Sequence, residues 1–144
     1  MWGLFFAILA GLAISFQNIL NTRVSNSLGT LGTATLVHFV GFLTCCVIVI
    51  LTNSFKDFKS ISELPIPYLF GGVVGVIIIF SIIKSINFLG ASYAIAVMIL
   101  IQILFSLFAD TFGLFGLDKI PLSPGRIMGV ILLIGGAFLF QLSK

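Results

Sequence analysis

The sequence predicts an all-α membrane protein in which residues 1–144 form a single domain of five transmembrane helices. Two observations support this fold class. Hydrophobic residues make up 60% of the chain and charged residues only 8%, whereas a soluble domain usually has about 25% charged residues. The apolar residues also form long blocks, and roughly 20 of them in a row are needed to cross a bilayer. The chain has too few polar residues to cover the surface of a water-soluble fold.

Five apolar blocks define the predicted helices, and they run over residues 2–21, 31–52, 68–88, 92–108 and 126–142. Every backbone N–H and C=O group in lipid must be paired internally, so only helices and closed barrels span a membrane. The blocks are too long for barrel strands and lack the alternating polar pattern of such strands. The first block has no basic segment before it and no clear cleavage site, so we interpret it as a retained helix rather than a signal peptide.

The segments between the blocks predict three loops and one tight connection. Residues 21–32 are rich in Asn, Ser, Thr and Gly, which predicts a short turn. Residues 53–67 carry charges and prolines and are expected to be the most water-exposed loop. Residues 89–91 leave so little chain that the third and fourth helices are expected to be antiparallel neighbours. Residues 113–124 are expected to lie in the membrane interface.

The distribution of basic residues gives little preference for one orientation. Five spans place Lys56, Lys59, Lys119 and Arg126 on one side of the membrane and Arg23, Lys84 and Lys144 on the other. Orientation normally follows a clear Lys/Arg excess on the cytoplasmic side. The near balance predicts one of two situations. Either the chain inserts in both orientations, or Arg23 and Lys84 lie too deep in the membrane to contribute to the charge balance. In the second case the N-terminus faces the cytoplasm.

Polar and glycine residues recur at particular positions in two parts of the sequence. The first two blocks contain Gly11, Gln17, Asn21 and Gly41, and the fourth block continues into the stretch QILFSLFADTFGLFG, which begins at Gln102. With these features the sequence resembles the YdcZ-type family of small bacterial inner-membrane proteins, within the drug/metabolite transporter superfamily. The resemblance covers almost the whole chain.

The resemblance implies a five-helix half-transporter in a bacterial inner membrane. Such chains occur as dual-topology homodimers, as pairs of oppositely oriented paralogues or as fused ten-helix proteins. An antiparallel dimer has the inverted-repeat symmetry of alternating-access transporters. The sequence departs from the family pattern at Ile101, where Gly is expected, and at Thr111, where His is frequent. These changes affect how closely another helix approaches Gln102 and remove a titratable neighbour of Asp110.

Two amides in the first block are candidate substrate-binding residues. Gln17 and Asn21 are four residues apart and share one helix face. An uncharged amide offers both donors and acceptors, so a polar substrate can be bound there without burying a charge. The alternative is hydrogen bonding between helices, which is common in membrane bundles.

The fourth block carries a polar stripe of Gln102, Ser106 and Asp110. Steps of four residues keep the three within about 80° around a helix. Gln102 and Ser106 are further candidates for substrate binding. Asp110 is a carboxylate at the edge of an apolar region and is the candidate for proton coupling. The alternative is that Asp110 caps the helix end or pairs with Arg126 or Lys119.

Four further polar residues receive structural interpretations. Lys84 is expected to extend its side chain to the interface, the alternative being a partner for Asp110 or for an anionic substrate. His38 is expected to have a packing or interfacial role. Cys45 and Cys46 lack metal-site spacing and are expected to be small buried residues.

Glycines recur at a spacing of four in two blocks. The pairs are Gly71 with Gly75, and Gly125 with Gly129. Small residues at this spacing let helices approach closely. We expect the last helix to contribute to the dimer interface, the alternative being ordinary glycine enrichment in membrane helices.

The combined pattern predicts a transporter rather than an enzyme. The sequence has no nucleophile–base constellation, phosphate-binding loop or metal spacing, and no cofactor is expected. We predict a secondary transporter of a small metabolite, working by alternating access as an antiparallel homodimer or paralogue pair. The alternatives are a passive dual-topology channel and a non-transporting accessory subunit.

Overall fold

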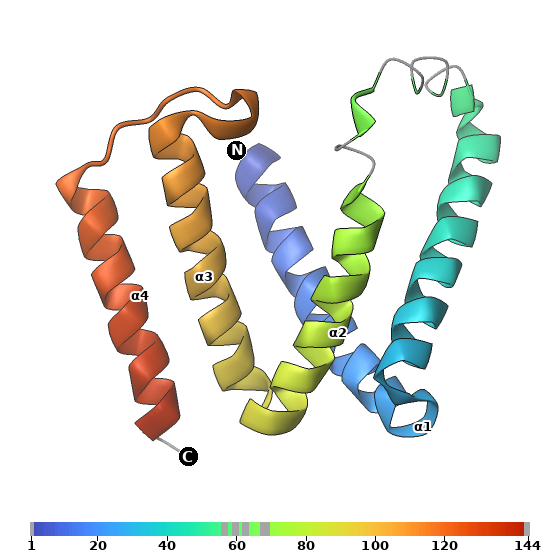
Figure 1. Cartoon of the computed structure of the whole chain (residues 1–144), viewed down its shortest axis with the longest axis horizontal. Coiled ribbons are helices and arrows are strands. Elements are labelled where there is room, and N and C mark those ends of the chain that lie inside the picture. Colours follow the sequence, from blue (N-terminus) through green and yellow to red (C-terminus); the bar gives the residue numbers. More distant parts are fainter. Residues whose placement is uncertain (1, 56–57, 59–60, 62–63, 67–69, 143–144) are drawn as a thin grey trace. The chain divides into compact units, whose positions relative to one another are not determined.

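The computed structural model describes residues 2–55, 58, 61, 64–66 and 70–142. The main elements within these residues are all helical (Figure 1): α1 (Trp2–Thr52), α2 (Gly71–Leu89), α3 (Ala91–Phe112), the short 3-10 helix η3 (Leu114–Gly116) and α4 (Pro124–Leu142). Helices α1 to α4 are each long and apolar enough to cross a membrane. The predicted all-α membrane class is therefore confirmed.

The side chains are distributed as expected for a protein surrounded by lipid. The buried apolar residues are few and mostly small, among them Ala94, Ala109 and Ala137. Large apolar side chains such as Phe16, Phe42 and Leu132 are exposed along the helices. In water this exposure would be very costly, whereas in a bilayer the acyl chains cover it.

Helix α1 differs from the prediction of a turn over residues 21–32. The chain stays helical through this segment, and only Gly29 has a non-helical backbone, with φ 70° and ψ 168°. A positive φ of this kind favours glycine. Figure 1 shows α1 doubling back at this point, which divides it into arms of residues 2–28 and 30–52. Each arm exceeds the roughly 20 residues that a span requires.

The polar residues that predicted a short turn over residues 21–32 are instead accommodated inside the helix. The Thr22 hydroxyl donates to the Asn18 carbonyl at 2.8 Å, and the Ser25 hydroxyl donates to the Thr22 carbonyl at 2.8 Å. Ser and Thr side chains can bond to the preceding helical turn in this way. The polar composition was therefore misread as a loop, because these hydroxyls are satisfied locally.

The connection before α3 is as tight as predicted, whereas α3 is longer than predicted. Gly90, with φ 81°, is the single residue between α2 and α3. Helix α3 continues to Phe112, four residues beyond the predicted end at 108, and stops at Gly113, whose φ of 64° is left-handed. Asp110 therefore lies in the last turn of the helix. The antiparallel pairing of the third and fourth helices stays a prediction.

The chain divides into two compact units, residues 1–84 and 85–144. In the first unit, the second arm of α1 meets α2 where His38 lies against Gly75: a Cβ at Gly75 would be 2.8 Å from the His38 Nε2. The charged positions of the predicted loop over residues 53–67 fall outside the described residues, as does Tyr68 at the predicted start of the third helix.

In the second unit α3 and α4 pack against each other and run antiparallel. At one end the Tyr93 hydroxyl donates to the Gln141 Oε1 at 3.0 Å. At the other end Asp110 meets Arg126. Three alanines on these two helices are buried, namely Ala94, Ala109 and Ala137. Small side chains let the two helices approach closely.

Candidate functional site: the hollow between α3 and α4

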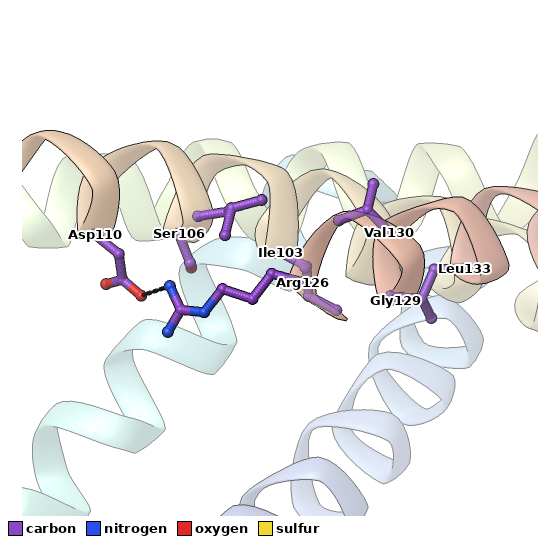
Figure 2. Close-up of a pocket in the computed structure, with 8 residues that line it drawn as sticks. Ile103, Ser106, Asp110, Arg126, Gly129, Val130 and Leu133 are labelled. Atoms are coloured by element: carbon purple, nitrogen blue, oxygen red, sulfur yellow. Dashed lines mark ion pairs between the residues drawn. The ribbon is translucent and has the colours of Figure 1, made fainter. Parts of the chain in front are cut away.

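A hollow of about 290 Å³ lies between α3 and α4. Figure 2 shows the side chains that line it. It is lined by Ile103, Ser106, Leu107, Asp110, Arg126, Gly129, Val130 and Leu133. The hollow therefore has charged groups at one end and aliphatic groups along the rest of its length.

Asp110 and Arg126 form a loose ion pair at the charged end. The Arg126 Nη1 lies 3.6 Å from the Asp110 Oδ2, and both side chains are about one-third exposed. Charge-assisted hydrogen bonds between such groups are usually about 2.7–2.9 Å long. The Nη1 atom is buried and has no hydrogen-bond partner among the described residues. The interpretation that Asp110 pairs with Arg126 is confirmed, while the guanidinium keeps unused donor capacity.

Local backbone contacts hold the two charged residues at the same end of the helix pair. The Asp110 carbonyl accepts hydrogen bonds from the Gly113 and Ile120 N–H groups at 3.3 and 3.0 Å. The connecting segment is thereby fastened to the end of α3. The Arg126 N–H donates to the Ser123 carbonyl at 3.0 Å in the first turn of α4.

The structure brings together part of the polar stripe predicted on α3. Ser106 and Asp110 both line the hollow, but Gln102 does not and is exposed elsewhere on the helix. The sequence indicated Arg126 only as one of the basic residues that bear on membrane orientation and as a possible partner of Asp110. Its place two residues after Pro124 was the available signal, because Pro favours the first turn of a helix.

The first arm of α1 carries a different set of buried polar residues from the one predicted. Asn21 is buried, with 6% of its surface exposed, but Gln17 is exposed. Asn18 and Ser25 are buried as well, at 5% and 9% exposed. The spacing of 18, 21 and 25 follows a helical period and would have identified this face. The side-chain amides of Asn18 and Asn21 make no hydrogen bond within the described part of the chain.

The other polar residues considered in the sequence, Lys84, His38 and the two cysteines, lie outside the hollow. The Lys84 Nζ lies 5.8 Å from the centre of the Phe80 ring, a cation–π geometry. The His38 Nδ1 lies 2.9 Å from the Ala34 carbonyl, which supports the expected packing role. Cys45 is exposed and Cys46 half-buried, so the expectation that both are buried is wrong. The described residues contain no group of three His, Cys, Asp or Glu side chains that could hold a metal ion.

Comparison with known proteins places this arrangement in a family. The family described as "Putative inner membrane exporter, YdcZ" matches residues 2–139. The chain belongs to the YdcZ family. It is 31% identical over 138 residues to the inner membrane protein YdcZ of Escherichia coli strain K12, a match that covers 93% of this chain and 91% of that protein. No solved structure matches the chain.

Membership in the YdcZ family agrees with the apolar spanning helices. The chain is a multi-pass inner-membrane protein of a family of exporters within the drug/metabolite transporter group. The description of the family is that of an inner-membrane exporter.

Proposed function

We propose that this chain is one half of a secondary transporter that exports a small polar metabolite. The observation that supports this best is the pair of Asn18 and Asn21, two buried residues whose side-chain amides bond to no other described residue. Intramembrane polar groups commonly mark substrate pathways, and the amide atoms of Asn18 and Asn21 keep accessible surface at which a ligand could bind. A polar substrate would supply the missing partners.

The proposed substrate-binding residues are Gln17, Asn21, Gln102 and Ser106, with Asn18 added from its burial. All are uncharged and lie on spanning helices. Amides and hydroxyls provide both donors and acceptors, which suits a neutral polar molecule. An antiparallel second copy of this chain, or a paralogue of opposite orientation, would contribute an equivalent set. The two sets together would form an inverted repeat around a site near the midplane.

Asp110 is proposed as the coupling residue, acting through its ion pair with Arg126. When Asp110 is ionised, its attraction to Arg126 holds the ends of α3 and α4 together. In that state the Arg126 Nη1 and the Asp110 Oδ2 are 3.6 Å apart. When Asp110 takes up a proton, that attraction is lost and the two helix ends are free to separate. Proton binding would thereby be linked to the opening of one side of the bundle.

The experiment is a counterflow assay with purified protein in liposomes loaded with a mixture of polar metabolites. Mass spectrometry follows which compounds leave in exchange for external ones. We expect flux of a polar compound that is abolished in Asn21→Ala and Gln102→Ala. Thr44→Ala is the matched control, because Thr44 is an exposed polar residue on a spanning arm and bonds only to the Val40 carbonyl. Normal flux in both amide variants would refute the site assignment.

The same liposomes distinguish the other two functions. Flux without counterflow or a proton requirement, together with electrical conductance, would identify a passive channel. Absence of all flux, together with a stable partner of unrelated sequence in mild-detergent extracts, would identify an accessory subunit.

A further inference from the structure

We propose that the hollow between α3 and α4 binds the headgroup and upper acyl chain of a zwitterionic phospholipid with a primary ammonium group. The inference concerns a lipid of the surrounding bilayer and does not depend on the proposed transport function. Three observations carry it: the depth of the hollow, the pairing of opposite charges at its end, and the unused hydrogen-bonding capacity of Arg126.

The hollow lies where a phospholipid changes from polar to apolar. Asp110 is in the last turn of α3, and Arg126 is in the first turn of α4, so both belong at one membrane boundary. Ile103 and Leu133 each lie seven residues further along their helices, which is about 10 Å deeper at the helical rise of 1.5 Å per residue. The charged end therefore matches a headgroup, and the aliphatic part matches the first carbons of an acyl chain.

The charges at this end fit a headgroup with one charge of each sign. Arg126 can bind a phosphate through its guanidinium, and the Asp110 carboxylate can accept hydrogen bonds from an ammonium group. The segment that joins the two helices adds Asp118 and Lys119, one further charge of each sign. The four charges cancel, so the site has no excess positive charge to favour an anionic lipid over a zwitterionic one.

Arg126 has a donor to offer such a ligand. Its Nη1 is buried yet makes no hydrogen bond among the described residues, and its contact with Asp110 is 3.6 Å long. A buried donor without a partner is costly. A phosphate oxygen at Nη1 would satisfy it, and an ammonium beside Oδ2 would add a second close contact while the ion pair stays in place. Gly129 leaves space for this, because nothing lies within 4 Å of the place where its Cβ would be.

The test is lipid retention by the purified full-length protein, measured by native mass spectrometry. Phosphatidylethanolamine, phosphatidylcholine and phosphatidylglycerol with identical acyl chains are added in equal amounts. We expect about tenfold stronger retention of phosphatidylethanolamine than of phosphatidylcholine, the factor that one charge-assisted hydrogen bond supplies. The methylated ammonium of phosphatidylcholine has no hydrogen to donate to Asp110. Equal retention of the two lipids would overturn the proposal without any variant.

Two variants assign the headgroup to its residues. Asp110→Asn should remove the advantage of phosphatidylethanolamine over phosphatidylcholine, and Arg126→Gln should weaken retention of every lipid at this site. Lys84→Gln is the control, because it removes a charge that lies outside the hollow. If Arg126→Gln does not fold, Arg126→Lys keeps the charge but loses the two-pronged donor. A preference for phosphatidylglycerol in the wild-type protein would also contradict the proposal, since it would indicate an anion site.

Discussion

The first arm of α1 and the hollow between α3 and α4 show two ways of placing polar groups in a membrane protein. In α1, Asn18 and Asn21 are buried residues whose side-chain amides bond to no other described residue. In the second unit, Asp110 and Arg126 are charged, lie at the helix ends and face each other. The neutral amides lie within a spanning arm and bond to no other described residue, whereas the charged groups lie at helix ends and form a loose ion pair. We expect the amides to be the groups open to a ligand and the ion pair to contribute little to stability.

The largest effect is expected from substitutions that remove the α1 amides, because these variants test whether the amides bind a ligand. Asn21→Leu should abolish transport while raising the thermal stability of the detergent-solubilised protein. The variant replaces a buried residue whose amide bonds to no other described residue, and such a replacement is often neutral or stabilising. Asn18→Leu should behave in the same way. The measurement pairs a flux assay with a thermal unfolding curve.

A loss of stability in Asn21→Leu would contradict this view of α1. It would mean that the amide contributes to the folded chain, as an interhelical contact would. Thr44→Leu serves as the control at an exposed position of the second arm, where neither transport nor stability should change much.

The next effect concerns the packing of the first unit around His38. Gly75→Ala places a Cβ about 2.8 Å from the His38 Nε2, so one of the two must move. Overpacking of this kind typically costs about 1–3 kcal/mol in free energy of unfolding. Gly71→Ala, one helical turn earlier, meets nothing within 4 Å and should be nearly neutral. Both variants are compared by denaturant unfolding in the same detergent.

Removal of the imidazole tests the cause of that effect. His38→Ala alone should lose the contact with the Ala34 carbonyl, seen at 2.9 Å. Combined with Gly75→Ala, it should recover most of the lost stability, because the new methyl group then has space. If the double variant is as unstable as the sum of the single variants, the clash is not the cause.

The sequence predicted the elements of the fold better than the chemistry between them. Block length and composition were enough for the spanning helices, because lipid leaves few alternatives for the backbone. The break in α1 was placed too broadly, because Thr22 and Ser25 bond within the helix instead of forming a loop. The break is at Gly29, one of several glycines in this part of the sequence. Its positive φ, which the sequence does not reveal, distinguishes it from the others in α1.

The candidate site was predicted only in part for a related reason. Spacing along α3 correctly placed Ser106 and Asp110 on a common face, because both depend on one helix alone. Whether Gln17 or Asn18 is the buried amide depends on how neighbouring elements cover that helix, and one periodic pattern does not specify this. The sequence offered two possible partners for Asp110, namely Arg126 and Lys119. The antiparallel packing of α3 on α4 brings Arg126 to it.

The smallest effect is expected from the ion pair itself. Both side chains are about one-third exposed and their contact is 3.6 Å long, and pairs of this kind contribute about 0–1 kcal/mol to stability. A double-mutant cycle with Asp110→Asn and Arg126→Gln should therefore give a coupling of less than about 1 kcal/mol. Tyr93→Phe, which removes the 3.0 Å bond to Gln141 at the opposite end of the helix pair, should cost about 1 kcal/mol. A coupling of several kcal/mol between Asp110 and Arg126 would instead show a rigid clamp, which neither a proton nor a lipid headgroup could easily open.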